Sequence, residues 1–341
     1  MDAPVPASPR PRSRVVSGMR PTGALHLGHY HGALKNWVRL QHDHECYFFV
    51  ADWHALTTHY ADREDLERNV YDMVVDWLAA GIDPDRATLF IQSRLPEHAE
   101  LFALLAMGTP LSWLERVPSY KDQIKALTGR DLATYGFLGY PLLQAADILI
   151  YKAALVPVGE DQAPHVEITR EVARRFNHLY GGGNTVLPEP AVLLTEVSKL
   201  PGLDGAKMSK SLANDIAMRE EPAEVERKIR RMPTDPDRVR RTDRGNPERC
   251  PVWQFHRVYS DTDTQAWVTQ GCTTAGIGCL ECKQPVIDAI VRQQAPWRER
   301  AEAYLSNPKQ VHWIVEVGTE RARARARQTM REVRGAMGLV Y

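Results

Sequence analysis

The sequence of 341 residues predicts an α/β protein: a Rossmann-like parallel-sheet domain with a helical insert, followed by a mainly α-helical C-terminal domain. Three observations support this fold class. Short continuous apolar runs in the first third of the chain are typical of strands buried on both faces of a parallel sheet. Segments with apolar residues at helical spacing separate these runs. Helical spacing also prevails after Glu221.

The first third of the chain alternates strand and helix signals, which is the βαβ pattern of nucleotide-binding folds. Gly18 ends the first β-branched run, and Gly81 closes the second helical stretch. In chain order we predict a strand at 14–18, a helix from 28 to about 41, a strand at 46–51, a helix at about 64–80 and a strand at 87–91.

The rest of the chain is predicted to be mainly helical. Helical patterns fill 101–177, with breaks near Pro118, Gly129 and Gly139, and an exposed loop is expected at 201–205. The arginine-rich tract 321–327 contains strong helix formers and no proline, so a charged helix is favoured over disorder. We therefore predict a disordered tail at 1–13, a Rossmann-like catalytic domain at 14–215 with an insert at about 101–180, and a helical domain at 216–341.

Charge and composition limit the partners that the chain can have. Its 43 Lys and Arg residues balance 43 Asp and Glu residues, so any contact with RNA has to rest on local basic patches, and we expect no DNA partner. No run of about 18 apolar residues occurs, and the Pro- and Arg-rich start has no apolar core of a signal peptide. We therefore expect a cytoplasmic protein without a membrane span.

Two short motifs contain side chains that suit phosphate chemistry. His26-Leu-Gly-His29 lies between the first predicted strand and helix, where imidazoles near a helix N-terminus can donate to phosphate oxygens. Lys207-Met-Ser-Lys210-Ser follows a glycine-rich loop, so its lysines can approach a triphosphate and stabilise departing pyrophosphate. Either motif alone is also compatible with a solvated loop. Their order, with a βαβ pattern between them, favours a shared phosphate site.

The two motifs resemble the HIGH and KMSKS motifs of class I aminoacyl-tRNA synthetases. Four further blocks resemble tryptophanyl-tRNA synthetases, namely 17–23, 51–57, 145–149 and 156–162. The resemblance extends from about Val15 to Tyr341. The alternatives are a tyrosine-charging relative, another HxGH nucleotidyltransferase, and an auxiliary paralogue that binds tryptophan or senses redox state without charging tRNA.

This resemblance implies a ligase that uses ATP. L-Tryptophan would attack the α-phosphate of ATP carrying Mg²⁺, giving tryptophanyl-adenylate and pyrophosphate, and the adenylate would esterify the terminal ribose of tRNA(Trp), by class I analogy at its 2′-hydroxyl. Catalysis by positioning and charge stabilisation would come from His26, His29, Lys207 and Lys210. The implied ATP site comprises Arg20, Thr22, His26, Gly28, His29, Asp161, Lys207, Met208, Ser209 and Lys210.

A second group of polar side chains shares one face of a helix that is predicted to start after Pro141. These are Tyr140, Gln144, Asp147 and Tyr151, at intervals of four, three and four. A buried carboxylate at Asp147 needs a donor, which from the residues alone is either a ligand or a lysine such as Lys152. The resemblance implies that Asp147 accepts the indole N–H of tryptophan. It also implies that the tryptophan pocket includes His54, Tyr140, Gln144, Val156, Val158 and Gln162.

Two positions differ from the residues that are common in the family. Gln144 stands where many bacterial members have methionine, and Arg20 stands where glutamine is common. Gln144 either contacts the indole or shapes the pocket wall. Arg20 suggests a changed contact to the carboxylate or to the ATP phosphates.

Four of the five cysteines lie close together in the sequence. Cys250, Cys272, Cys279 and Cys282 form a C-x21-C-x6-C-x2-C pattern, whose four thiolates suit zinc or a 4Fe-4S cluster. The resemblance favours the 4Fe-4S cluster, because an iron-sulfur-containing subset of bacterial tryptophanyl-tRNA synthetases has nearly this arrangement, with a first gap one residue longer. The alternative is four independent reduced cysteines. Cys46 lies in an apolar strand and is expected in the core.

The resemblance also implies partners for the helical regions. Anticodon recognition in the family belongs to the C-terminal domain, and a homodimer is expected with the insert after Leu101 as its interface. Arginines can contact phosphate or stack on unpaired bases, although nearby acidic residues make a salt-bridged surface equally compatible. The basic candidates are Arg227, Lys228, Arg230, Arg231, Arg238, Arg240, Arg241 and Arg244.

Overall fold

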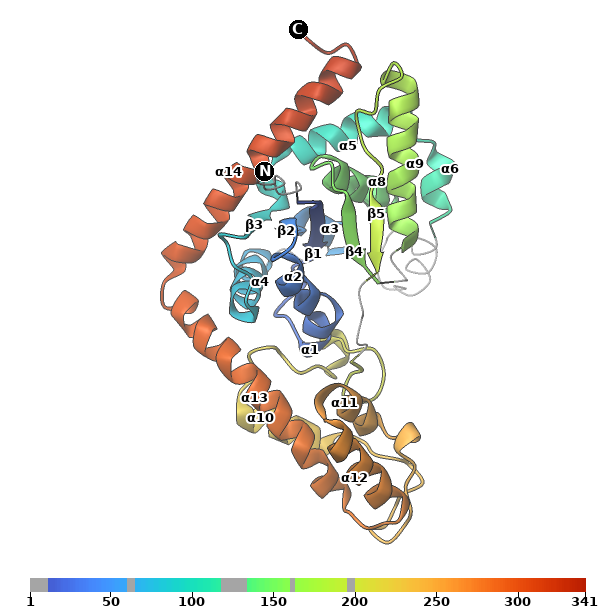
Figure 1. Cartoon of the computed structure of the whole chain (residues 1–341), viewed down its shortest axis with the longest axis vertical. Helices are drawn as coiled ribbons and strands as arrows, with labels where there is room; N and C mark the ends of the chain where they lie inside the picture. The colour runs from blue at the N-terminus through green and yellow to red at the C-terminus, as the bar shows by residue number, and fades with distance from the viewer. Residues whose placement is uncertain (1–11, 60–64, 118–133, 160–162, 195–199) are drawn as a thin grey trace, which may run out of the picture.

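The computed structural model describes residues 12–59, 65–117, 134–159, 163–194 and 200–341. At its centre lies a five-stranded sheet in the order β3-β2-β1-β4-β5, in which every neighbouring pair is parallel (Figure 1). The strands are β1 Arg14–Met19, β2 Glu45–Val50, β3 Ala87–Ile91, β4 Leu155–Val158 and β5 Ala191–Leu194. The predicted α/β class with a parallel sheet is therefore confirmed.

The three strands predicted in the first third of the chain are confirmed, whereas β4 and β5 were not predicted as strands. Both have only four residues. Pro157 interrupts the strand signal of β4, and that segment lies within the stretch that we predicted as mainly helical. Pairing of β4 with β1 and β5 extends the sheet despite these weak local signals.

Side chains alternate between the two faces of the sheet and so build two cores. Val15 and Phe48 face one core, in which Trp37 stacks on Phe48 with ring centroids 4.4 Å apart. The adjacent residues Val16 and Phe49 face the other core. This alternation follows from the two-residue period of a strand and explains why both faces are covered by helices.

The helices that cover the sheet hold the loops at its carboxyl edge. The predicted helix from 28 to 41 contains a π-helical turn, Tyr30–Leu34, between two α-helical segments. Gly81, with a left-handed φ of 111°, ends the predicted helix of the second βα unit, as expected. The bounds are α1 Leu27–His29, α2 Lys35–Leu40, α3 Asp52–His59, α4 Leu66–Ala80, α5 Pro96–Gly108, α6 Leu111–Glu115, α8 Tyr135–Leu149 and α9 Ala163–Tyr180.

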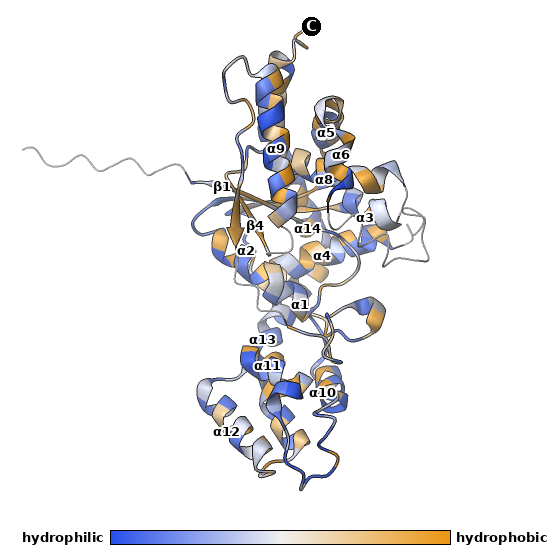
Figure 2. Cartoon of the chain, turned by 90° about the vertical axis from the view of Figure 1, so that its right-hand side faces the viewer, coloured by the Kyte–Doolittle hydropathy of each residue, from blue (hydrophilic) through white to orange (hydrophobic). Residues whose placement is uncertain are grey.

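The C-terminal region is helical, as predicted. Figure 1 shows α10, α11, α12 and the first part of α13 as a lobe beside the sheet domain, while α14 runs back along the sheet. In Figure 2 the strands β1 and β4 are mainly hydrophobic, whereas the lobe helices have mixed surfaces. The bounds are α10 Pro222–Arg231, α11 Pro251–Tyr259, α12 Thr262–Thr273, α13 Cys279–Leu305 and α14 Pro308–Ala336.

Helix α14 lies unusually close to the edge strand β3. A Cβ atom at Gly318 would lie 1.8 Å from the carbonyl oxygen of Leu89, so only glycine permits this approach. The arginine-rich tract 321–327 lies in the same helix, which confirms its prediction as helical. Because α14 packs on the sheet, the domain boundary at 216 stays a prediction.

Within the described residues, no helix is both long and apolar enough to cross a lipid bilayer.

Candidate active site

The two predicted phosphate motifs lie side by side at the carboxyl edge of β1. Leu27 N donates to Ile216 O at 2.9 Å, and Met218 N donates to Leu25 O at 2.9 Å. These bonds form a short antiparallel bridge between His26 and Ala217. The histidine motif is thereby joined to the segment that follows the lysine motif, although about 180 residues separate the motifs in sequence.

A buried carboxylate anchors this bridge to α4. Asp76 is fully buried and accepts hydrogen bonds from Leu25 N at 3.0 Å and from Arg219 Nε at 2.5 Å. One bond fixes the histidine segment and the other fixes the chain beyond the lysine segment. Asp76 therefore joins the histidine segment to the chain that follows the lysine motif.

The two histidines are placed as neutral hydrogen-bond donors. Their rings lie 3.7 Å apart, and His26 N donates to His29 Nδ1 at 3.2 Å, so the proton of a neutral His29 is on Nε2. Burial lowers the pKa of His26 to about 4 and that of His29 to about 3. Both imidazoles are therefore uncharged near neutral pH and can donate to phosphate oxygens without adding charge.

The lysine motif faces the histidine motif across the loop that follows β1. A Cβ at Gly23, whose φ is +116°, would lie 2.5 Å from Lys210 Nζ. Gly28 N lies 3.4 Å from the Met208 sulfur. Burial lowers the pKa of Lys210, and the Asp215 carboxylate opposes this shift. Glycine at position 23 thus leaves room for the Lys210 ammonium group beside the backbone, and glycine at position 28 leaves room for the His26 and Met208 side chains.

Asn214 holds the lysine loop in this shape. Its Oδ1 accepts from Ser209 N at 2.7 Å, and its Nδ2 donates to Lys207 O at 3.1 Å and to Asp204 Oδ1 at 2.8 Å. The side chain is buried, so these bonds are shielded from water. Our sequence reasoning missed Asn214, because a single asparagine after a loop gives no distinct signal.

A first cavity of about 210 Å³ lies beside Gly18 at the end of β1. The predicted residues His54, Tyr140 and Gln144 all line it, together with Arg20. Tyr140 OH lies 3.5 Å from His165 Nε2, a residue that sequence reasoning missed. The remaining lining residues are Ala51, Thr57, Thr58 and Phe137.

A second cavity of about 460 Å³ adjoins the first, since Gly18, Arg20 and Gln144 line both. The predicted phosphate-site residues Gly28, His29 and Lys207 line it. Val156 and Val158, predicted for the tryptophan pocket, line this second cavity and not the first. The buried side chain of Asn36 also reaches it. A small cavity beside a larger phosphate-facing one suits an amino acid next to a nucleotide.

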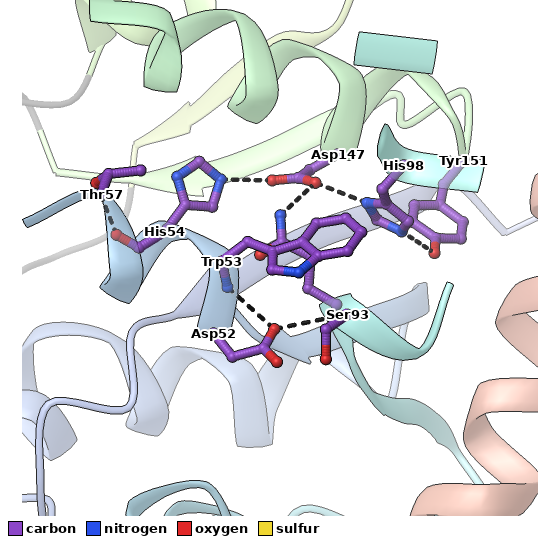
Figure 3. Close-up of polar contacts among 9 residues, drawn as sticks. Asp52, Trp53, His54, Thr57, Ser93, His98, Asp147 and Tyr151 are labelled. Carbon is purple, nitrogen blue, oxygen red and sulfur yellow. Dashed lines mark hydrogen bonds and ion pairs between the residues drawn. The ribbon is translucent and has the colours of Figure 1, made fainter. Parts of the chain in front are cut away.

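Behind the first cavity, Asp147 accepts three hydrogen bonds (Figure 3). Its donors are His54 Nε2 at 2.7 Å, Gln92 Nε2 at 2.8 Å and His98 Nδ1 at 2.6 Å. Burial raises the pKa of Asp147, but the hydrogen bonds from His54 and His98 outweigh it and lower the pKa to about 2. The carboxylate is therefore ionised in the interior.

Comparisons with known proteins agree with this geometry. A family model described as "tRNA synthetases class I (W and Y)" matches residues 8–293. The chain belongs to this family. It is therefore an aminoacyl-tRNA synthetase.

Relatives of the synthetase match it over nearly their whole lengths. It is 58% identical to the tryptophan–tRNA ligase of Ralstonia nicotianae, with 96% of this chain and 99% of that protein covered. It is 52% identical to the tryptophan–tRNA ligase of Thermotoga maritima, with 96% and 100% covered. A solved structure of tryptophanyl-tRNA synthetase from Campylobacter jejuni, complexed with ADP and tryptophan, matches with a TM-score of 0.84 and 32% identity over 96% and 100% of the two chains.

For the helix that contains Asp147, the expected start was wrong and one of the two alternative partners of Asp147 is excluded. In the synthetase this helix, α8, starts at Tyr135, where the Thr134 side chain accepts from Phe137 N, so Pro141 lies inside it. Lys152 is not the partner of Asp147, because Lys152 has a left-handed φ of 48° and its side chain pairs with Glu332. Tyr151 lies beyond the helix end but still reaches His98.

All the predicted ATP and tryptophan contacts remain predictions. Thr22 lies in a tight turn in which its N donates to Arg20 O at 2.9 Å, close to the phosphate motifs of the synthetase. Asp161 and Gln162 lie outside the described residues.

The four clustered cysteines lie in the C-terminal lobe of the synthetase. Cys250 precedes α11, Cys272 is in α12, and Cys279 and Cys282 are in the first turn of α13. In the described ranges, no three His, Cys, Asp or Glu side chains converge closely enough to hold a metal ion. Cys46 is buried in β2, as expected for a core residue.

Proposed function

We propose that this synthetase activates tryptophan with ATP and transfers it to tRNA(Trp). The small cavity bounded by His54, Tyr140 and Gln144, next to the joined phosphate motifs, carries this proposal. The two curated relatives described above, which are matched nearly end to end, bear the name tryptophan–tRNA ligase. The auxiliary paralogue is therefore not favoured.

The first step is attack of the tryptophan carboxylate on the α-phosphate of ATP, which enters with Mg²⁺ as part of the substrate. No side chain has to act as nucleophile. Neutral His26 and His29 donate to phosphate oxygens, while Lys207 and Lys210 stabilise charge on the departing pyrophosphate. The ADP and tryptophan bound to the Campylobacter jejuni enzyme support this pair of substrates.

Amino-acid-dependent ATP–pyrophosphate exchange is the direct test of this function. We expect tryptophan to support exchange and tyrosine to support it at least about 10⁴-fold less well, because a site built around one hydrogen bond strongly rejects a ligand that cannot make it. Charging of tRNA(Trp) transcripts then checks the second step. Exchange with tyrosine, or exchange without charging, would contradict the proposal.

Contacts with tRNA are proposed for the C-terminal lobe. Several predicted basic residues are engaged in ion pairs, such as Arg227 with Glu224 and Arg230 with Glu226. Arg240 and Arg244 are exposed and make no ion pair within the described part of the chain. They lie in the same loop as Val239, which is 84% exposed, and this supports the loop over α10 as the place that meets RNA.

We propose a 4Fe-4S cluster on the four clustered cysteines. All four cysteines lie in one lobe, with Cys250 before α11, Cys272 in α12 and both Cys279 and Cys282 in the first turn of α13. Zinc requires all four about 2.3 Å from one ion, whereas a cube of four irons holds them farther apart. The support for the cluster over zinc is the C-x21-C-x6-C-x2-C spacing, which resembles that of the iron-sulfur-containing subset of the family.

Two donors near these sulfurs suit bound thiolates. His256 Nε2 lies 3.4 Å from Cys282 Sγ, and Arg238 Nη1 lies 3.9 Å from Cys272 Sγ. Hydrogen bonds to sulfur and a positive neighbour stabilise the negative charge of a ligated cluster. The cluster would tie α11, α12 and α13 together and so order the lobe.

Purification without oxygen checks the identity of the metal. We expect brown protein with iron and acid-labile sulfide in near-equal amounts. We also expect Cys279→Ser to reduce tRNA charging more than tryptophan-dependent exchange, because the catalytic cavities contain none of the four ligands. Stoichiometric zinc without iron would contradict the cluster, and equal loss of both activities would contradict its local role.

A homodimer through the helical insert is also proposed. Met107, Leu111 and Leu179 are 76%, 56% and 46% exposed. They lie at adjoining ends of α5, α6 and α9, since a Cβ at Gly108 would lie 3.5 Å from a Leu179 methyl group. Such an apolar patch is typical of a subunit interface. Sedimentation of the protein and of Leu179→Asp, which should be monomeric, tests this assignment.

A cytoplasmic location is the remaining part of the proposal. It rests on the use of tRNA, whose charging serves translation. Cell fractionation followed by a charging assay would test it, and activity confined to a membrane fraction would contradict it.

A further inference from the structure

We propose that His98 and Gln92 are positioning residues for the Asp147 carboxylate. They keep it ionised and oriented and leave one of its acceptor positions open, so that it selects an aromatic amino acid with a ring N–H. This inference rests on the proposed function and names residues that recognise the substrate indirectly. Neither His98 nor Gln92 lines the first cavity, and both are completely buried.

The carboxylate of Asp147 has about four acceptor positions, of which three are occupied. Oδ1 accepts from Gln92 and His98, and Oδ2 accepts from His54. One position, on the oxygen shared only with His54, is therefore left for a further donor. Asp147 itself does not line the first cavity, but His54, the partner of Oδ2, does, so a substrate N–H in that cavity would reach Oδ2 from the His54 side.

His98 donates to Asp147 because its own hydrogen bonds fix its tautomer. A carboxylate only accepts, so Nδ1 carries the proton of the 2.6 Å bond. Nε2 lies 2.7 Å from Tyr151 OH, and in the neutral ring it accepts the phenol proton. Figure 3 shows this series of bonds, from Tyr151 through His98 to Asp147. Every donor points toward the carboxylate, so the network favours its charged form.

Gln92 is oriented toward Asp147 at a cost to stability. Its Nε2 donates to Asp147, which leaves its buried Oε1 without a hydrogen-bond partner among the described residues. An unsatisfied buried acceptor is unfavourable, and such groups in native structures call for a functional explanation. Presenting a third donor to the carboxylate supplies that explanation.

Asp52 couples two of the donors. Its Oδ1 accepts from Trp53 N at 3.1 Å and from Ser93 N at 3.0 Å. His54 is two residues beyond Asp52 in α3, and Gln92 immediately precedes Ser93 in the 3₁₀ turn Gln92–Arg94 after β3. Figure 3 shows Asp52 joining these two segments below Asp147. The spacing of the donors is therefore fixed from outside the cavity.

The test compares tryptophan with its isostere β-(3-benzothienyl)alanine, in which sulfur replaces the ring N–H. In ATP–pyrophosphate exchange, we expect His98→Leu to raise the KM for tryptophan about 10- to 100-fold, the range of a hydrogen bond to a charged group. The KM for ATP and the use of the isostere should hardly change, because neither depends on the ring N–H. Discrimination between the two amino acids should fall by the same factor.

His98→Asn is the matched variant, because an asparagine amide can donate from nearly the position of Nδ1. It should restore most of the discrimination lost in His98→Leu. Gln92→Met and Tyr151→Phe remove one donor each at nearly constant volume, and each should lower discrimination several-fold. They keep the test decisive if His98→Leu does not fold.

Equal losses for tryptophan and the isostere in these variants would overturn the inference, because a purely structural role affects both. Unchanged discrimination would overturn it as well. Failure of the proposed function is distinguishable, since the unmodified enzyme would then show no tryptophan-dependent exchange at all.

Discussion

Replacing Lys210 with alanine is expected to slow formation of tryptophanyl-adenylate by about 10²–10³-fold, the usual effect of removing one group that stabilises transition-state charge. The Lys210 ammonium lies beside Gly23, across from His26 and His29, whose rings lie 3.7 Å apart. It does not line the first cavity, so tryptophan affinity should change little. Single-turnover measurement of adenylate formation, with tryptophan affinity measured separately, checks both statements.

Lys309→Ala provides the matched control for this prediction. Lys309 is an exposed lysine in the first turn of α14, so its loss removes the same charge away from both cavities. Lys309→Ala should form tryptophanyl-adenylate at the rate of the unmodified enzyme. If Lys210→Ala forms the adenylate at the normal rate but binds tryptophan more weakly, Lys210 stabilises the bound substrate and not the departing pyrophosphate.

The parts of the site that could be predicted from sequence are those with strong local signals. His26 and Lys210 belong to motifs whose residue types suit phosphate, and the structure joins their segments through backbone hydrogen bonds. Tyr140 and Gln144 share a helix face at an interval of four, and both line the first cavity. Periodicity predicts such neighbours because it acts within one element.

Contacts between distant segments could not be predicted in the same way. The bonds from Gln92 and His98 to Asp147 span 55 and 49 residues, and no spacing rule reaches that far. One signal was available for Gln92, since it follows β3 at the carboxyl edge where ligands bind to parallel sheets. Lys152 was considered as a partner of Asp147 because the two residues are close in sequence. The left-handed backbone at Lys152 instead directs its side chain to Glu332.

Buried carboxylates explain how these distant segments come to one place. Asp76 joins the histidine segment to the chain after the lysine motif, and Asp52 joins α3 to the turn after β3. Asp147 joins α8 to both α3 and that turn. Each buried carboxylate needs several hydrogen-bond donors, so each favours the one arrangement in which the segments that supply those donors pack together. Precise geometry at the cavities thus follows from polar contacts behind them.

Asp147 carries the second large prediction. Asp147→Ala is expected to lower kcat/KM for tryptophan by about 10²–10³-fold with little change in ATP binding, because truncating one member of a buried charged hydrogen-bond group typically costs about 2–5 kcal/mol. The substitution removes the proposed indole acceptor and also leaves His54, Gln92 and His98 without an acceptor. Tryptophan-dependent exchange at varied tryptophan and ATP concentrations measures both effects.

The acid stability of the same variant separates recognition from folding. The folded-state pKa of Asp147 is about 2, below the value of about 3.9 for an unfolded aspartate. The stability from its ionised form is therefore present above about pH 4 and is lost as pH falls toward 2. Asp147→Ala should lack this part of the acid dependence and should melt at a lower temperature at neutral pH. Asp147→Asn, which keeps the side-chain volume, should still discriminate poorly against the sulfur isostere. If Asp147→Asn selects tryptophan normally, the negative charge of Asp147 is not needed to recognise the indole N–H, because an amide oxygen can also accept it.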